Sequence, residues 1–495
     1  MYNLLDEPWL PVRRGIDTET VGLRELFRRA HEFEDLAVPV PPAAAGLLRI
    51  LYAMTARVTG LDQPADWSNR QLDVLERGRF DPGAVDAYYD RFPGRFDLFD
   101  EQRPWLQDPR LAAECPKSSG VNKLAFDRPA GNTQVWFGHH TDAAAVPVSA
   151  PQAAWYLVAQ LYYGASGRCT SRAVGGQQFA NMSAGPLRGA MSYHPLARTL
   201  FESLVVGVPH PEDGASSEDR CPWERDELPD PLGRPDPLTW PGGMLTGRYR
   251  HAILLVPASG GGEVTDAYLT WGRRTAPEDY PDPYVVHKRS KQGSWYQLPA
   301  DSARALWRDV DALLADNDDE ARGSRRPTIM TDWKDLPIGE HGRVRAFGFD
   351  QDGQAKDRQW FTATTPPIVR WLEENDPEAA NGIRGLREQA EMVGRRLETV
   401  LKAVWREMVN VTGGDRPPEG PWATRAAGHY WSQAEGVFWR HVERRNFDAA
   451  RASFLSLGHD AIEYAAGAHT SRRIVKAVTA AHRRLSSRPT ERKTA

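Results

Sequence analysis

The chain has 495 residues, of which 41% are hydrophobic, 26% charged and 10% aromatic, so it is long enough for about two to four domains and too apolar for disorder. Its net charge of −4 argues against a simple nucleic-acid coat protein, which would be basic throughout. Its three cysteines, Cys115, Cys169 and Cys221, are widely spaced and exclude a disulfide framework or a close zinc-ligand pair.

The start of the chain carries Asp6 and Glu7 where a secretory signal has a basic region and an apolar run, so we expect no signal peptide. The longest apolar stretch, 43–54, contains Arg49 and is shorter than the roughly 18 residues that a membrane span needs. These features predict a cytoplasmic protein with no membrane partner.

The first 365 residues predict an α+β domain with long functional loops. Apolar spacing indicates helices at 23–30 and 43–58, and Ser149 with Gln152 indicates the start of an aromatic-rich helix that ends near Tyr163. Strand patterns follow at 251–256 and 264–271, joined by three glycines, and predict a hairpin whose edge presents Arg273 and Arg274.

Three long segments between these elements, 110–148, 164–193 and 209–243, show no regular pattern and are expected as irregular loops. The loop 164–189 holds six glycines together with Arg168, Arg172 and Arg188 and several amides, a composition that lets backbone approach a phosphate or sugar. Further on, Asp352-Gly353 between apolar flanks is typical of a plain hairpin turn.

Pro366 and Pro367 mark the expected domain boundary, which gives an α+β domain at 1–365 and an all-α four-helix bundle at 366–495. The helical seams are spaced by three and four residues: Leu386, Ala390, Val393, Leu397, Leu401, Val404 and Met408, then Trp431, Ala434, Phe438 and Val442, then 449–457, then Ile474, Val478, Ala481 and Leu485.

Basic residues are concentrated in this C-terminal part. Residues 366–495 carry 21 Lys and Arg against 16 Asp and Glu, while residues 1–365 carry 41 against 50. Eight basic residues lie within 470–495, among them Arg472, Arg473, Lys476, Arg483 and Arg484. A solvated helix face has the same composition as a phosphate-binding face, so both interpretations stay open.

No common catalytic motif is present: the chain has no nucleophile elbow, Walker loop, dinucleotide fingerprint or His-Glu-x-x-His. One cluster, His139, His140 and Asp142, has metal-ligand chemistry, but adjacent histidines diverge and no spaced second pair supports them. The residues alone therefore give no sign of catalysis or of a bound cofactor; the alternative to a protein that is not an enzyme is an orphan metal-dependent hydrolase that uses these three residues.

Segments spread over both predicted domains resemble the CasA family, the large subunit of the type I-E CRISPR Cascade surveillance complex. In chain order they are Asn3-Leu-Leu-Asp-Glu-Pro-Trp-Leu-Pro-Val12, Gly22-Leu-Arg-Glu-Leu26, Arg103-Pro-Trp-Leu-Gln107, Leu124-Ala-Phe-Asp-Arg-Pro129, Pro186-Leu-Arg-Gly189, Tyr280-Pro-Asp-Pro283 and Gly348-Phe349 through Gln354-Ala355.

The resemblance implies a non-catalytic subunit that inspects duplex DNA while the guide RNA reads the sequence, so that the protein reads only the protospacer-adjacent motif (PAM). It implies three DNA-contacting loops. These carry Gly185 and Arg188 in the glycine-rich loop, Arg273 or Arg274 ahead of the Pro-x-Pro segment, and a wedge of Gln354 and Ala355, with Gly353 as the shifted alternative, because this hairpin is one residue longer than the family pattern.

The resemblance also implies that Phe126, with Arg128 beside it, anchors the subunit near the crRNA. The expected partners are crRNA, the other Cascade subunits, double-stranded target DNA and the nuclease-helicase. The basic face of Arg472, Arg473, Lys476, Arg483 and Arg484 is expected to hold the displaced strand.

Overall fold

The computed structural model describes residues 1–130, 140–141, 143–211, 218–235, 237–275, 281–316, 323–331, 333–353, 356–409, 420–468 and 471–487. The chain forms two compact units, one made of Met1–Ala303 with Glu320–Arg370 and the other of Arg304–Asp319 with Trp371–Ala495. Residues 304–316 thus pack with the C-terminal helices. That functional domains divide at 365/366 stays a prediction.

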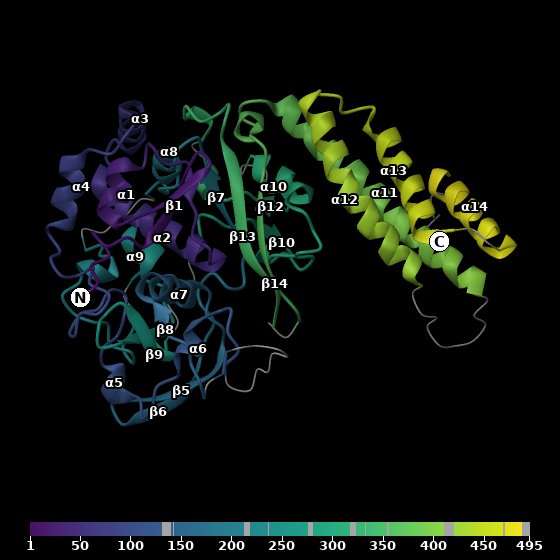
Figure 1. The fold of residues 1–495 in the computed structure, drawn as a ribbon. Helices are drawn as coiled ribbons and strands as arrows, with labels where there is room; N and C mark the ends of the chain where they lie inside the picture. Colours follow the sequence, from purple (N-terminus) through teal and green to yellow (C-terminus); the bar gives the residue numbers. More distant parts are fainter. Residues whose placement is uncertain are drawn as a thin grey trace. The chain divides into compact units, whose positions relative to one another are not determined.

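The first unit mixes helices with small sheets (Figure 1). Its sheets have the strand orders β2-β1-β3, β4-β9-β8, β14-β13-β7, β11-β10-β12 and β5-β6. The strands are β1 (Leu10–Arg14), β2 (Asp17–Val21), β3 (Asp35–Leu36), β4 (Val148–Ser149), β5 (Gly167–Val174), β6 (Gln177–Met182), β7 (Ser192–Leu196), β8 (His251–Pro257), β9 (Glu263–Trp271), β10 (His287–Arg289), β11 (Trp295–Gln297), β12 (Ser324–Arg325), β13 (Arg343–Gln351) and β14 (Asp357–Thr364).

The helices of this unit are α1 (Leu23–Arg29), α2 (Pro41–Thr59), α3 (Trp67–Arg77), α4 (Pro82–Tyr89), α5 (Leu111–Glu114), α6 (Val121–Leu124), α7 (Ala150–Tyr163), α8 (Leu200–Val206) and α9 (Gly242–Thr246). The predicted helices at 23–30, 43–58 and 149–163 correspond to α1, α2 and α7, and the predicted hairpin corresponds to β8 and β9. A capping box of Ser149 and Gln152 starts α7.

Helices α2 and α7 form the centre of the core, and nearly every residue of each is buried. They cross closely at Gly46, where a Cβ would lie 2.7 Å from the ring of Tyr162. Arg49, inside the apolar run, is neutralised by Asp282 at 3.0 Å and lies over the ring of Tyr284. Burial is the largest single effect on Asp282 and would raise its pKa, but Arg49, Arg248 and the backbone amide of Tyr284 together lower it.

Two of the segments expected as irregular loops contain regular structure, since 110–148 includes the short helices α5 and α6. The segment 164–193 is not an irregular loop, because it contains the paired strands β5 and β6 and the start of β7, which joins β13. Its strands are polar and half-exposed, so they lack the apolar alternation by which strands are identified.

The second unit consists of C-terminal helices, α11 (Pro377–Val409), α12 (Pro421–Glu443), α13 (Ala450–Ala466) and α14 (Arg472–Ser486), with the short helix α10 (Val310–Leu314). Helix α11 contacts α12, α13 and α14. The expectation of a protein of mixed helices and strands that ends in helices is confirmed. The seams at 386–408, 431–442 and 474–485 are buried except for Met408, Trp431 and Ile474, which are half-buried. In 449–457, Ala450 and Phe454 are buried.

The segment 304–314 is bound to the long helices by a buried carboxylate. Glu391 on α11, 4% exposed, accepts hydrogen bonds from Arg304 and Arg308, both at 2.7 Å. Trp307 lies between these arginines in sequence and packs against Phe438 with a ring separation of 4.7 Å. None of the helices within the described ranges combines the length and the apolar composition that crossing a bilayer requires.

Candidate nucleic-acid interface

The tip of the β5–β6 hairpin is a two-residue turn of glycines. Val174 pairs with Gln177, and Gly175 and Gly176 between them have φ of 55° and 78°. Positive φ at both central residues defines a type I′ turn, which only small residues adopt without strain. Both glycines are exposed, as are Gln177 and Gln178. The hairpin therefore presents backbone and amide groups to solvent.

A buried arginine holds this hairpin in place. Arg172, 0% exposed, binds Asp108 at 2.8 Å and Glu114 at 2.6 Å, and donates to the carbonyl of Trp271 at 3.1 Å. The charge of Arg172 is thus neutralised by carboxylates inside the protein. Of the three arginines in the glycine-rich segment, Arg168 alone is exposed, whereas Arg172 and Arg188 are buried.

The end of β9 packs against the same hairpin. The guanidinium of Arg274 lies 4.1 Å from the ring centre of Phe179 and donates to the carbonyl of Asn181 at 3.0 Å. The indole of Trp271 donates to the carbonyl of Phe179 at 3.1 Å. Arg273 is half-buried and Arg274 exposed. The structure thus brings two of the three predicted DNA-contacting segments together.

Gly185 and Arg188, at the end of the glycine-rich segment, are both buried. A Cβ on Gly185 would lie 2.5 Å from the carbonyl oxygen of Tyr162, so only glycine fits this close approach. Arg188 is 6% exposed; it binds Asp357 at the start of β14 and the carbonyl of Tyr163, and it lies over the ring of Phe349. Burial lowers the pKa of Arg188 more than Asp357 raises it.

Strands β13 and β14 form the predicted hairpin (Figure 1). Its turn is closed by two hydrogen bonds between Asp352 and Lys356, of 2.9 Å and 3.0 Å, and Gly353 is exposed. The predicted wedge residues Gln354 and Ala355 lie outside the described residues.

Phe126 packs on the stem of this hairpin. It is half-buried and stacks on Phe349 with ring centres 6.3 Å apart and planes 11° apart. Phe349 also meets Trp360 edge-on at 4.8 Å. Arg128 is half-buried and donates to the carbonyl of Val146. The residues expected to anchor the subunit therefore lie in the same unit as the hairpin and directly contact it through Phe126.

Helix α14 carries the predicted basic face. Arg472, Arg473, Lys476 and Arg483 are exposed, whereas Val478, Ala481 and Leu485 are buried. Arg484 differs from the other four because Glu407 on α11 binds it through two hydrogen bonds of 2.8 Å and 2.9 Å. The side chain of Ser471 caps the helix, and its first turn contains two arginines and no acid.

The alternative metal site can be judged only in part. His139 and Asp142 lie outside the described residues, and His140 is half-buried. In the ranges that the structure covers, no three His, Cys, Asp or Glu side chains are grouped as metal ligands would be.

Sequence reasoning missed the residues that connect the predicted loops. Asp108 and Glu114 hold Arg172, Asp357 holds Arg188, and Phe349 joins Phe126 to the hairpin. These partners are between 58 and 223 residues apart in the chain, for example 58 for Glu114 and 169 for Asp357. No local pattern marks such pairs.

Comparison with known proteins identifies a family whose model matches most of the chain. The model of the family described as CRISPR-associated protein Cse1 matches residues 3–468. A curated relative, CRISPR-associated protein CasA/Cse1 of Thermus thermophilus, is 27% identical over 484 residues, which cover 94% of this chain and 91% of that protein.

Solved structures that are similar to this chain support the match to this family. A chain of a CRISPR RNA-guided surveillance complex is 43% identical, with a TM-score of 0.88, over 98% of this chain and 99% of the other. Thermobifida fusca Cse1, at 20% identity and a TM-score of 0.77 over 98% of each chain, shares the fold.

Proposed function

Because this chain belongs to the CRISPR-associated protein Cse1 family, we propose that it is the large, non-catalytic subunit of an RNA-guided surveillance complex and reads the PAM of double-stranded DNA. It would then assemble with crRNA and the other Cascade subunits in the cytoplasm, open the duplex next to the PAM, and recruit the nuclease-helicase.

The observation that carries the proposal is the direct connection between the three predicted DNA-contacting segments. Arg274 packs on Phe179 of the glycine hairpin, and Arg188 joins the glycine-rich segment to Asp357 of the wedge hairpin. Side-chain contacts therefore connect three segments from distant parts of the sequence. A protein that recognises a short duplex needs its contacting segments to be held together, because they must meet the groove simultaneously.

The chemistry of the exposed tips suits the minor groove. That groove offers a nearly degenerate set of acceptors, so it is read by shape and by a few donors. The exposed glycines of the β5–β6 turn permit close backbone approach, and Gln177 and Gln178 supply amide donors. Such contacts exclude some base pairs while tolerating several PAM sequences.

The β13–β14 hairpin would provide the wedge. Inserting a side chain between base steps costs a few kcal/mol of unstacking, which pairing with the guide then offsets. In this proposal Gln354, followed by Ala355, enters the stack, with Gly353 as the shifted alternative. The four-helix bundle of α11 to α14 would hold the displaced strand along its basic face.

The wedge is tested by Gln354→Ala in the assembled complex. We expect weaker binding to an intact duplex target and unchanged binding to a target that is already unpaired beside the PAM, because unstacking is then no longer required. The matched control is Gln359→Ala, which removes an exposed glutamine from the stem of the same hairpin. Equal losses on both targets would contradict the wedge.

A further inference from the structure

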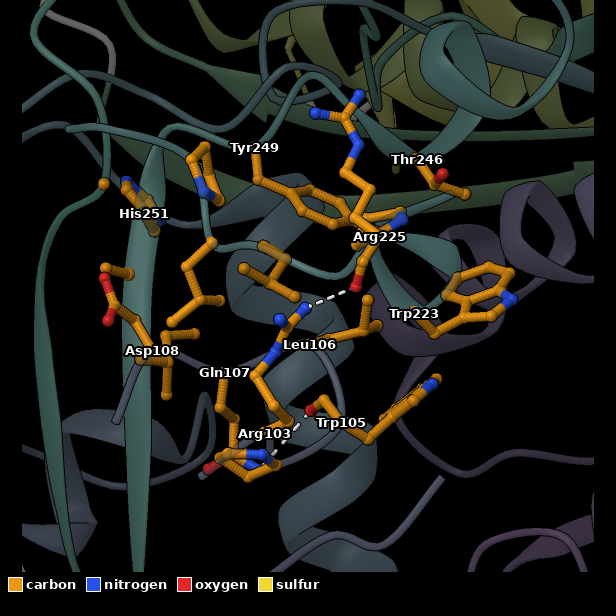
Figure 2. A pocket seen from close by; sticks show the side chains of 18 of the residues that line it. Arg103, Trp105, Leu106, Gln107, Asp108, Trp223, Arg225, Thr246, Tyr249 and His251 are labelled. Carbon is orange, nitrogen blue, oxygen red and sulfur yellow. Dashed lines mark hydrogen bonds between the residues drawn. The ribbon is translucent and has the colours of Figure 1, made fainter. Parts of the chain in front are cut away.

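A cavity of about 130 Å³ lies in the first unit between the segment 103–108, the segment 222–229 and the start of β8 (Figure 2). This volume is roughly ten times the space that one water molecule needs. The segment Arg103-Pro-Trp-Leu-Gln107, one of those that stand out in the sequence, forms one wall of it, and no step of the proposed function uses this wall.

The lining is rich in arginine. Five arginines contribute to it, against two acids: Arg95, Arg103, Arg110, Arg225 and Arg273 against Asp108 and Glu227. Arg110 is paired with Asp108 at 2.8 Å, and Arg95 with Asp226 at 3.3 Å. The cavity is therefore surrounded by more cationic than anionic side chains.

Arg103 differs from these paired arginines. It reaches across the cavity and donates to the backbone carbonyl of Arg225 at 2.7 Å (Figure 2). It also donates to the backbone carbonyl of Asp226. Among the described residues, no carboxylate lies within ion-pair distance of it. Burial, and next the charge of Arg95, lower the pKa of Arg103. The charges of Asp226 and Asp100 raise this pKa by less, so a bound anion would add negative charge that these two carboxylates do not fully supply.

The wall that carries Arg103 is rigid and locally strained. Leu106 has a φ of 57°, a conformation that bulky residues seldom adopt. Gln107 fixes the strand beside it, because its amide donates to the carbonyl of Leu98 and accepts from the backbone of Leu255, both at 2.7 Å. Strain that the surrounding structure maintains is a feature of binding sites.

The remaining lining is apolar and partly aromatic, with Trp105, Leu106, Leu161, Trp223, Tyr249 and Ile253. A neutral apolar ligand would give the guanidinium of Arg103, whose hydrogen bonds go to neutral carbonyls, no counter-charge, and a bare inorganic anion would leave the aromatic walls unfilled. A ligand that matches both features has a flat ring and an acidic group.

We propose that this cavity binds a small aromatic anion, a planar ring bearing a phosphate or a carboxylate. The ring packs among Trp223, Tyr249 and Leu106, and the acidic group accepts paired hydrogen bonds from Arg103. Arg273 belongs both to this lining and to a predicted DNA-contacting segment, but the site is defined by Arg103 and the aromatic walls and is tested on the chain alone.

The test is isothermal titration of the full chain with four probes: AMP, 1-naphthoate, adenosine and inorganic phosphate. We expect at least one of the two ring anions to bind, and to bind more tightly than adenosine or phosphate. Arg103→Met should weaken that binding by about tenfold or more, because a charged hydrogen bond is lost. The matched control is Arg289→Met, since Arg289 also donates to a backbone carbonyl but does not line the cavity.

A second variant tests the proposal independently in case Arg103→Met does not fold. Leu228→Trp places a large ring at the half-exposed rim of the cavity and keeps every charge, so it should also weaken binding of the ring anion. The proposal is overturned if neither ring anion binds, if phosphate or adenosine binds as tightly, or if folded Leu228→Trp and Arg103→Met bind as the parent does.

Discussion

Arg188 donates a hydrogen bond to Asp357 and so joins the glycine-rich segment to the first residue of β14. The side chain of Arg188 is 8% exposed and that of Asp357 31%. Asp357 pairs with Gln351 beside the turn of the β13–β14 hairpin, so the contact lies at the turn end of the hairpin, where Arg188 also covers Phe349. A displacement of either segment is therefore transmitted to the other.

The first prediction concerns this pair. Arg188→Met and Asp357→Asn should each lower the free energy of unfolding by about 1 to 3 kcal/mol, because each leaves a partly buried charge or its partner unsatisfied. The double variant should cost less than the two single costs together. Urea unfolding followed by tryptophan fluorescence gives the coupling energy.

The exposed pair Arg13 and Glu34, with side chains 46% and 47% exposed, is the control for this cycle. Its coupling energy should lie near zero to about 1 kcal/mol. Strict additivity at Arg188 and Asp357 would mean that the two segments are not coupled through this contact.

The second prediction concerns Arg273 and Arg274. Replacing both with Ala should cost on the order of 1 to 3 kcal/mol of target binding and reduce its salt dependence. Because Arg274 also packs on Phe179, the single variant Arg273→Ala separates loss of charge from loosening of β6. Titrations of duplex DNA at two salt concentrations measure this, and unchanged affinity at both would leave the pair a structural role only.

The third prediction concerns the basic face of α14. Neutralising Arg472, Arg473, Lys476, Arg483 and Arg484 should leave first PAM contact intact and reduce R-loop stability and delivery of the strand to the nuclease-helicase. Since Glu407 already pairs with Arg484, we expect most of the effect from the other four, and Arg484→Gln alone should chiefly weaken the contact with α11. Permanganate footprinting of the displaced strand is the measurement. Identical protection in variant and parent would assign these charges to solubility.

The fourth prediction is an acid sensitivity that comes from His194. This residue is 0% exposed and stacks on Tyr284 at 4.9 Å, and burial, followed by the charge of Arg49, lowers its pKa well below the usual value. Below about pH 6.5 the unfolded chain binds a proton at this position that the folded chain does not. The free energy of unfolding should therefore fall as the pH decreases, by at most about 1.4 kcal/mol per pH unit for this one group.

His194→Asn should flatten this dependence relative to the parent, although His251, whose pKa burial also lowers, will retain its own contribution. Urea unfolding between about pH 5 and pH 7 compares the two slopes. Parallel slopes would show that His194 does not bind the proton that destabilises the fold.

Elements with local signals could be predicted from the sequence. Ser149 and Gln152 form a capping box, so both the start and the type of α7 followed from four residues. The seam of α11 was equally local, since its apolar positions recur every three or four residues along one helix.

The β5–β6 hairpin could not be predicted in the same way, because its strands are polar and long-range contacts hold them. In the sequence Arg172 has the character of a basic loop residue. In the structure its side chain is fully buried and paired with Asp108 and Glu114. For the same reason, segment 304–314 gave no sign of its place beside α11, which depends on Glu391.

The arginines in the first turn of α14 give this helix a second property. The amino end of a helix carries partial positive charge, so the charges of Arg472 and Arg473 destabilise this end of α14, although Ser471 caps it. A phosphate bound there would remove that repulsion and accept hydrogen bonds from the free backbone amides. The amide protons of the first turn should then exchange more slowly once the displaced DNA strand is bound. Hydrogen exchange at this helix end would therefore report whether the displaced strand occupies the basic face.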